Sequence, residues 1–502
     1  MAQSLWSFAE KAAKAALNAA KTELDPDRML GHTMAGFIEL AASRYAVNPG
    51  DQWAPGKPLK LLLAGYSGTR NTGADVRVEE IVRQMRHLVG DDQLDLSILT
   101  INPELSRGYF RTVKQLHLPQ FFPPFLLETI HKQHGVIACE GSMFKSKFAN
   151  ALSIMMVGSL GIASAENKLA IGYGGEAGSM DPILENLVRK YCQEALIVVR
   201  NKESGEVLSR LGVASRPGTD TAWTFEPAPA EVGEELLKKA GWDGKTKVLA
   251  ICPINPFWWP VKPDIMKGAT HAFTGAHSES HYDSFYFHND GDKVRDKQAA
   301  YIKALADGFR RFRAKHAVFP ILVGMEQLDR RACEALQREL GEEIPLFVSD
   351  EFEMYEMVSV IRRASMMLSS RYHAIVTSMP GLVPSAGVTM DERIRNLMSD
   401  RGQPKLALEV DDPDLADKVY ETLMYLNAEA DEVREGIAQC VVTNLVRMGE
   451  MGMHFVDHVR ARHPEFEFRE GLGAGGDPWK HLPSLPKAVE KLVERAGGAR
   501  AA

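Results

Sequence analysis

The sequence predicts an α/β protein with two Rossmann-like domains in a GT-B-like arrangement and a cleft between them. Two observations favour this fold class. Short apolar runs typical of strands alternate with helical patterns, which indicates parallel sheets joined by crossover helices. The alternation occurs in two separate series, and a chain of 502 residues is too long for one ordinary core.

The first series follows a helical extension, residues 1–58. It predicts a Rossmann-like domain over residues 59–225, with strands at 59–66, 94–101, 135–140, 168–173 and 195–200. The next segment, 226–246, contains Pro227, Pro229 and Gly233 and has no strand pattern. We therefore expect a linker there.

The second series predicts a Rossmann-like domain over residues 247–463, with strands at 248–253, 317–323, 344–349, 364–370 and 383–388. Its last part, 411–463, has the pattern of two helices that finish this domain and pack back across the first. Residues 464–502 are rich in glycine, so we expect a flexible tail with one short helix at 485–496.

Composition limits the classes of partner and the cellular location. The formal net charge is −7 and both signs are mixed along the chain, which does not favour a nucleic-acid partner. The five scattered cysteines indicate a reducing compartment, so we expect a cytoplasmic protein. The most apolar stretch, 151–165, is shorter than the about 20 residues of a transmembrane helix and predicts a buried helix instead. An amphipathic N-terminal helix leaves peripheral membrane contact open.

The segment around residues 369–393 says most about function. Arg371 and His373 stand where the apolar run 364–368 gives way to a helix, which places both at the carboxyl end of a strand. Open α/β sheets bind ligands at that end. A guanidinium binds phosphate or carboxylate, and an imidazole moves protons near neutral pH. The segment therefore predicts an anion site with acid/base capacity.

Four segments resemble, in order, motifs of the polysaccharide pyruvyl transferase family. They are the glycine loop Gly65 to Asp75, the turn Gly141 to Phe144, the arginine-led helix from Val199 through Val213, and Ser370-Arg371-Tyr372-His373 through Asp391-Glu392-Arg393. The chain departs from the family pattern at Ala74, Glu140, Tyr372 and Arg393. These departures indicate a divergent member of the family.

The resemblance implies transfer of a pyruvyl group from phosphoenolpyruvate to two hydroxyls of a sugar, giving a ketal in surface polysaccharide or glycoconjugate biosynthesis. The partners would be this small donor and a sugar or glycolipid acceptor, with no required cofactor or metal. That reaction needs cations for the phosphate and carboxylate and a group that moves protons. We assign His373 as the acid/base and predict donor contacts from Arg371, Arg393, Arg200, Arg70, Gly68, Asn71, Gly141 and Ser142.

A long insertion, residues 255–292, carries aromatic and histidine side chains. We expect it to be a lid or a sugar platform. The predicted acceptor contacts are Trp258, Trp259, His281 and Tyr282 of the insertion, together with Glu140. A weaker alternative is a metal site, because His277, Glu279 and His281 would share one side of an extended chain.

Several alternatives stay open at this level. His373 could be a core residue, Arg371 could pair with Asp350 or Glu351, and Arg200 could form a structural ion pair beside a helix capped by Asn201 or Ser204. Gly65, Gly68 and Gly73 could simply allow a tight turn. The chain could also be a GT-B glycosyltransferase with a nucleotide-sugar donor, or a catalytically silent sugar-phosphate binding protein. A site that fits only a three-carbon anion beside Arg371 would favour phosphoenolpyruvate.

Overall fold

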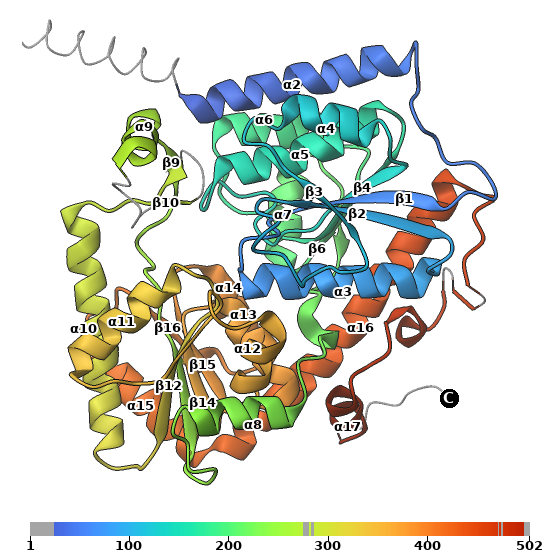
Figure 1. The fold of residues 1–502 in the computed structure, drawn as a ribbon. Helices are drawn as coiled ribbons and strands as arrows, with labels where there is room; N and C mark the ends of the chain where they lie inside the picture. The colour runs from blue at the N-terminus through green and yellow to red at the C-terminus, as the bar shows by residue number, and fades with distance from the viewer. Residues whose placement is uncertain (1–24, 275–280, 283–285, 470, 473–474, 496–502) are drawn as a thin grey trace, which may run out of the picture.

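The computed structural model describes residues 25–274, 281–282, 286–469, 471–472 and 475–495. It shows two parallel-sheet α/β domains in a GT-B-like arrangement, as the sequence predicts (Figure 1). The N-terminal domain contains the blue to blue-green elements of Figure 1, and the C-terminal domain contains the bright green helix α8 (Ala230–Lys239) and most of the yellow and orange elements.

The N-terminal sheet has seven strands in the order β3-β2-β1-β4-β5-β6-β7, and all neighbours are parallel. The strands are β1 Leu59–Ala64, β2 Leu94–Thr100, β3 Lys114–His117, β4 Gly135–Ala138, β5 Leu169–Gly175, β6 Leu196–Val199 and β7 Arg216–Pro217. Its helices are α3 Thr72–Val89, α4 Pro123–Ile130, α5 Asn150–Ala165, α6 Pro182–Tyr191 and α7 Lys202–Arg210.

The C-terminal sheet has six strands in the order β13-β12-β8-β14-β15-β16, again all parallel. They are β8 Val248–Cys252, β12 Phe319–Gly324, β13 Leu346–Val348, β14 Met366–Ser369, β15 Ser385–Thr389 and β16 Ala407–Glu409. The helices are α8 Ala230–Lys239, α10 Asp292–Arg313, α11 Asp329–Leu340, α12 Met354–Ile361, α13 Tyr372–Ser378, α14 Glu392–Asp400, α15 Leu415–Ala428, α16 Ala430–Arg462 and α17 Lys487–Arg495.

Both sheets therefore reverse their strand order between the first and fourth strand of the domain. In a Rossmann fold this reversal opens a crevice outside the carboxyl ends of the strands. The crevices lie beside β1 and β4 in one domain and beside β8 and β14 in the other. This topology sets the place of a ligand site before any side chain is considered.

Apolar runs form the two cores as expected. The predicted buried helix at 151–165 is α5, whose residues from Ser153 to Ala163 are all buried. It packs with α2 (Pro26–Tyr45), α4 and α6 on one face of the N-terminal sheet. The other face of that sheet shares one continuous apolar core with the C-terminal domain. The two domains are thus packed together behind the cleft.

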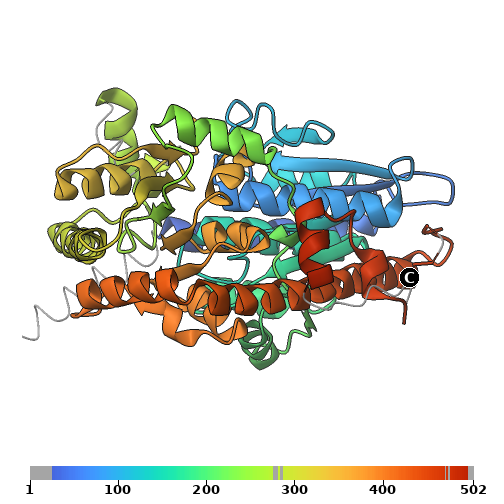
Figure 2. The same ribbon diagram turned by 90° about the horizontal axis from the view of Figure 1, so that it is seen from below.

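Helix α16 joins the two domains along their length (Figure 2). It contacts α15 in the C-terminal domain and α3, β5, β6 and β7 in the N-terminal domain. This confirms the expected pair of helices after residue 411, the second of which packs back across the first domain.

The structure differs from the sequence expectation in several short elements. Strands β3, β7 and β16 were not expected because they are short and none of them is a run of buried apolar residues. The predicted linker contains helix α8, which packs on α12 through the close approach of Gly233 to Ser359. Much of the expected flexible tail is packed instead: His481 and Val489 are fully buried. Its predicted terminal helix is α17.

The insertion forms a small unit that contacts the N-terminal domain (Figure 1). It contains helix α9 (Ile265–Thr274) and the short strands β9 (Lys262–Pro263), β10 (His281–Tyr282) and β11 (Tyr286–Phe287). The Tyr286 hydroxyl donates to Asp27 of α2 at 2.8 Å. No helix in the described part of the chain is both long and apolar enough to cross a bilayer. The amphipathic N-terminal segment, for which the sequence leaves membrane contact open, lies outside the described residues.

Candidate functional site

A cavity of about 710 Å³ lies between the two domains. Part of its wall comes from α5, the residues before it and the insertion, and much of the wall comes from segments at the carboxyl ends of parallel strands in both sheets. After β1, β2, β3 and β4 these are Tyr66 to Ala74, Ile101 to Leu105, His117 to Phe122, and Glu140 with Ser142; after β8, β12, β14 and β15 they are Ile254, Met325 to Leu328, Ser370 to His373, and Met390 with Arg393. The carboxyl ends of the two sheets therefore meet at one cavity, as the topology requires.

The cavity gathers many of the residues that the sequence singled out. His373, Arg371, Arg393, Gly68, Asn71, Ser142, Glu140 and Trp259 all line it. Arg200, Arg70, Gly141 and Trp258 are not among the lining residues. Three of the four motif segments are thus brought together, although they are far apart in the sequence.

His373 lies in the first turn of α13 and contacts a carboxylate of the other domain. Its Nε2 is 3.2 Å from Oδ2 of Asp220, which follows β7. The side chain is 14% exposed, so it is packed but open to the cavity. Burial lowers the pKa of His373 below its ordinary value of 6.5, although the Asp220 carboxylate opposes this shift. The imidazole is therefore mainly neutral and able to accept a proton at neutral pH.

Asp220 organises the cations behind His373. Its Oδ2 lies 3.1 Å from Nε of Arg77 and accepts from Nη1 of Arg200 at 2.9 Å. The backbone N–H of Ala222 donates to Oδ1 at 3.0 Å. Although burial alone would raise the pKa of Asp220, these cations and His373 hold it far below its usual range. Asp220 is therefore a fixed anion that orients the His373 ring.

Arg371 does not present a free charge to the cavity. Its Nε donates to Asp329 Oδ2 at 2.8 Å, and its Nη2 donates to Asp329 Oδ1 at 2.5 Å and to Glu326 at 2.8 Å. The expected alternative, a pair with Asp350 or Glu351, is wrong because both of these carboxylates bind Arg330. Two carboxylates thus surround one guanidinium, and burial with the nearby Glu326 raises the pKa of Asp329.

Arg393 is a better candidate for an anion contact. It lies in the first turn of α14, and its Nε donates to Asp391 at 2.8 Å. Its guanidinium also stacks 4.6 Å from the centre of the Phe148 ring. Among the described residues, Asp391 supplies the only carboxylate in an ion pair with Arg393, and the Arg393 side chain is 21% exposed. A phosphate in the cavity can therefore reach a donor group of Arg393.

Arg200 and Arg70 have structural partners. Arg200 is buried, donates to Glu176 at 2.8 Å as well as to Asp220, and stacks on Tyr372. Arg200 therefore forms the structural ion pair that was one of the two sequence-based alternatives. Asn201, one of the two expected caps, caps the helix that follows, α7. Arg70 donates to the carbonyl of Leu105 and to the Tyr109 hydroxyl.

The glycine loop brings the two domains close together. Gly68 has a φ of +79°, a conformation that glycine adopts without strain. Gly73, in the first turn of α3, packs directly on His373, and a Cβ at this position would lie 2.3 Å from the ring Nδ1. Gly73 thus does more than allow a turn, because any side chain there would displace His373.

Asp75 is buried below this loop. Neither carboxyl oxygen has a hydrogen-bond partner of normal geometry within the described residues. Burial raises the pKa of Asp75 to about 8, although the backbone N–H of Gly68 and the charge of Arg70 oppose the shift, and Glu140 and Glu326 add to it. The side chain is therefore mostly a neutral carboxylic acid at pH 7.

The insertion supplies one side of the cavity through Trp259, Val261 and Tyr286. Trp258 instead contacts the His288 ring, with centroids 4.8 Å apart. His277, Glu279 and the side chains of His281 and Tyr282 lie outside the described residues. Among the residues that are described, no cluster of three or more metal-ligating side chains is found.

Sequence reasoning missed Asp220, Glu326 and Asp329. Glu326 and Asp329 follow the predicted strand 317–323, so the rule that ligand sites lie at carboxyl ends of strands would have found them. Asp220 follows a strand of only two residues, which leaves no apolar signal in the sequence.

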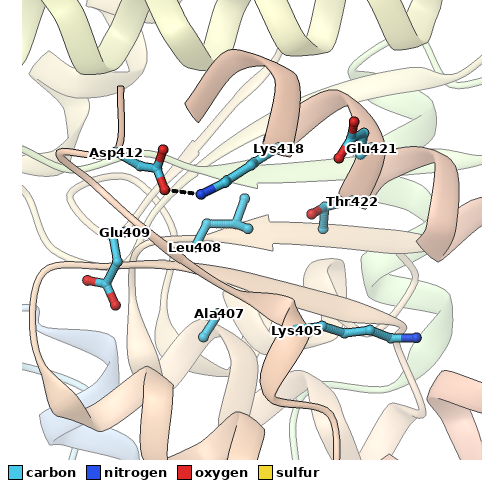
Figure 3. A pocket seen from close by; sticks show the side chains of 8 residues that line it. All are labelled: Lys405, Ala407, Leu408, Glu409, Asp412, Lys418, Glu421 and Thr422. Atoms are coloured by element: carbon cyan, nitrogen blue, oxygen red, sulfur yellow. Dashed lines mark hydrogen bonds and ion pairs between the residues drawn. The ribbon is translucent and has the colours of Figure 1, made fainter. Parts of the chain in front are cut away.

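A smaller hollow of about 320 Å³ lies at the edge strand β16, beside α15 (Figure 3). Charged side chains dominate it, and Lys418 is paired with Asp412. It shares no lining residue with the interdomain cavity.

Comparison with known proteins identifies no family for this chain. No protein-family model matches, and neither does any curated protein sequence. Among solved structures, a putative UDP-N-acetylglucosamine 2-epimerase from Listeria monocytogenes has 9% identity and a TM-score of 0.47 over 76% of this chain and 91% of that chain. UGT2 of Phytolacca americana, complexed with UDP-2fluoro-glucose and pterostilbene, has 10% identity and a TM-score of 0.46 over 78% and 96%. Similarities this weak say nothing about the reaction of this chain.

Proposed function

We propose that this protein is a transferase that moves a group from a phosphate-bearing donor to a sugar hydroxyl in the interdomain cavity, and that the donor is a nucleotide sugar. The observation that carries the proposal is the size of the cavity beside His373 and Arg393, about 710 Å³. Ligand pockets of about 300–1,000 Å³ hold molecules much larger than a three-carbon anion.

The charges around Arg371 also favour this donor over phosphoenolpyruvate. A phosphate and a carboxylate on three carbons need several unneutralised cations close together. Arg371 is instead bound by Glu326 and Asp329, which leaves Arg393 as the cation that is best placed for a phosphate contact. This arrangement favours a donor whose negative charge lies on its phosphates alone over a donor that also carries a carboxylate.

In the proposed reaction His373 accepts the proton of the acceptor hydroxyl. The hydroxyl oxygen forms a bond to the anomeric carbon of the donor, and the bond from that carbon to the phosphate oxygen breaks. The nucleotide leaves with the electron pair, and its charge is stabilised by Arg393. Asp220, 3.2 Å from Nε2, stabilises the imidazolium that forms.

Pyruvyl transfer from phosphoenolpyruvate is the second candidate. Its support is that Gly68, Asn71, Ser142, Arg371, His373 and Arg393, which come from the segments resembling that family, line one cavity. A sugar acceptor could then occupy the remaining volume. The two candidates differ in the donor and in the leaving group.

The deciding experiment offers the purified protein a panel of nucleotide sugars and, separately, phosphoenolpyruvate, each with a panel of glycoside acceptors. Nucleotide release with a glycosylated product is the expected result. Release of inorganic phosphate with a pyruvate ketal would overturn the first proposal in favour of the second. Stabilisation against heating by a donor, without any product, would indicate a sugar-phosphate binding protein.

A further inference from the structure

The lining of the interdomain cavity contains two unlike groups of side chains, which we call its two halves. The polar half includes Glu140, Ser142, Glu326 and Arg393 together with His373. Five apolar lining residues come from α5, the start of α4 and the insertion, and we call this group the apolar compartment: Phe122, Leu152, Met155, Trp259 and Val261.

The apolar compartment is built from three elements that pack together. Leu152 and Met155 are three residues apart on α5 and so share one face of that helix. Phe122 directly precedes α4, which packs on α5. The insertion closes the compartment, because the Val261 N–H donates to the Phe148 carbonyl at 2.9 Å.

Phe148 connects the two halves. Its ring lies 4.6 Å from the guanidinium of Arg393 on the polar side and 5.1 Å from the Trp259 ring on the apolar side. A single ligand can therefore extend from Arg393 in the polar half, past Phe148, into the apolar compartment. Such a ligand must be polar at one end and apolar at the other.

A nucleotide base does not suit the apolar compartment. Its edges carry several hydrogen-bonding groups, and burying them against leucine, methionine, phenylalanine and valine would leave these groups without partners. An aliphatic or aromatic group has no such groups to satisfy and gains from removal of its surface from water.

We infer that the acceptor is an amphipathic glycoside: its sugar lies at His373 and its apolar aglycone fills the apolar compartment. This inference rests on the proposed function for the role of the sugar as acceptor. The compartment itself predicts binding of an apolar group attached to a sugar, whatever the donor.

The test measures binding without any donor, by isothermal titration calorimetry with methyl, octyl and phenyl β-glucoside, the octyl compound below its micelle concentration. We expect the octyl or the phenyl glucoside to bind at least tenfold more tightly than the methyl glucoside. A preference for octyl identifies an aliphatic aglycone, and a preference for phenyl identifies an aromatic one. Equal affinity for all three would overturn the inference.

Variants locate the effect. Leu152 is only partly buried and lines the cavity. Leu152→Lys therefore places a charge in the apolar compartment without burying that charge in the core of the domain. This change should abolish the preference, whereas Leu152→Met should retain it. Leu40→Lys is the matched control, because Leu40 is 50% exposed on α2 and does not line the cavity. A preference that survives Leu152→Lys would contradict the inference.

Failure of the proposed function has a different signature. If the glucosides bind as expected but no donor gives a product, the transferase proposal fails while the amphipathic site stands. If a donor and an acceptor react but methyl and octyl acceptors show equal affinity and equal KM, the apolar compartment has no role in acceptor binding.

Discussion

His373 and Asp220 come from different domains, and their contact is the feature of single residues that most concerns chemistry. The Asp220 carboxylate is held as an anion by Arg77 and Arg200, so it cannot itself take the proton from His373. Its role is therefore to orient the ring and to stabilise the charge on it. Because these four side chains lie together, a change in one affects the others.

His373→Ala should lower kcat at least about 100-fold while donor affinity changes little, because the imidazole moves a proton and does not bind phosphate. Steady-state kinetics and calorimetric donor titration measure the two effects. Because burial lowers the pKa of His373 below its ordinary value of 6.5, the loss of wild-type activity at acid pH should have its midpoint below that value. Loss of folded protein in the variant would instead mean a core role.

Arg393→Gln should weaken donor binding by about tenfold or more, because it removes a charge-assisted hydrogen bond to phosphate. Arg395→Gln is the matched control on the same helix, since Arg395 pairs with the exposed Glu409 and does not line the cavity. Donor affinity by calorimetry checks both variants. An equal effect of the two would show that Arg393 has no specific role.

Asp75→Asn should change how stability depends on pH. The folded protein keeps a proton on Asp75 up to about pH 8, whereas the unfolded chain releases it near the ordinary value of 3.8. The free energy of unfolding of the wild type therefore loses a contribution as the pH rises through this window. The free energy of unfolding of the variant, minus that of the wild type, should therefore be larger at pH 8 than at pH 5.

Urea denaturation of both proteins at the two pH values measures this difference. Each unit of pH within the window is worth at most about 1.4 kcal/mol. A stability difference that is the same at both pH values would show that Asp75 is ionised in the folded protein.

At the scale of elements, the first turns of α3 and α13 are in direct packing contact across the cleft. The contact joins Gly73 at the start of α3 to His373 at the start of α13, and the Thr72 N–H donates to the Met325 carbonyl of the other domain at 2.8 Å. The position of the His373 ring therefore depends on how closely these two helices approach.

Gly73→Ala should lower kcat by about tenfold or more, since the new methyl group would displace the imidazole. Gly36→Ala in α2 is the control, because a Cβ there has no neighbour within 4 Å. The control should keep full activity and gain slight helix stability. Unchanged kinetics of Gly73→Ala would mean that the contact between α3 and α13 is not needed for activity.

At the scale of the whole molecule, the domains share structure behind the cleft. One apolar core extends from β1 and α3 to the C-terminal sheet, and α16 contacts elements of both domains. The insertion adds a third contact between the domains. Its Val261 N–H donates to the Phe148 carbonyl, and its Tyr286 hydroxyl donates to Asp27. The separate folding of either domain would expose much of this common core.

Thermal unfolding should therefore be a single transition, with equal calorimetric and van't Hoff enthalpies. Differential scanning calorimetry without ligand tests this expectation. Two resolved transitions would show that the shared core does not couple the domains.

Much of the fold could be predicted from the sequence because its signals are local. Apolar runs and helical periodicity mark β1, β8, β12, β14 and α5, since burial of these side chains does not depend on distant partners. Very short strands such as β7 carry too few residues for a pattern. The helix α8 in the predicted linker was missed for a different reason: Pro227, Pro229 and Gly233 dominate the signal there.

The candidate site could be predicted in part. The placement of Arg371, His373 and Arg393 at the carboxyl ends of strands followed from local sequence, and these residues do line one cavity. The partners of these charges could not be predicted: Asp220 is 153 positions from His373, and Asp329 is 42 positions from Arg371.

By itself, the sequence determined two Rossmann-like domains and the strand ends where polar side chains gather, because short-range burial and backbone geometry fix both. Only the tertiary structure decided which of those side chains carry usable charge. Electrostatic pairing depends on distance in space, and folding placed two carboxylates on Arg371, one on Arg393 and a fixed anion beside His373.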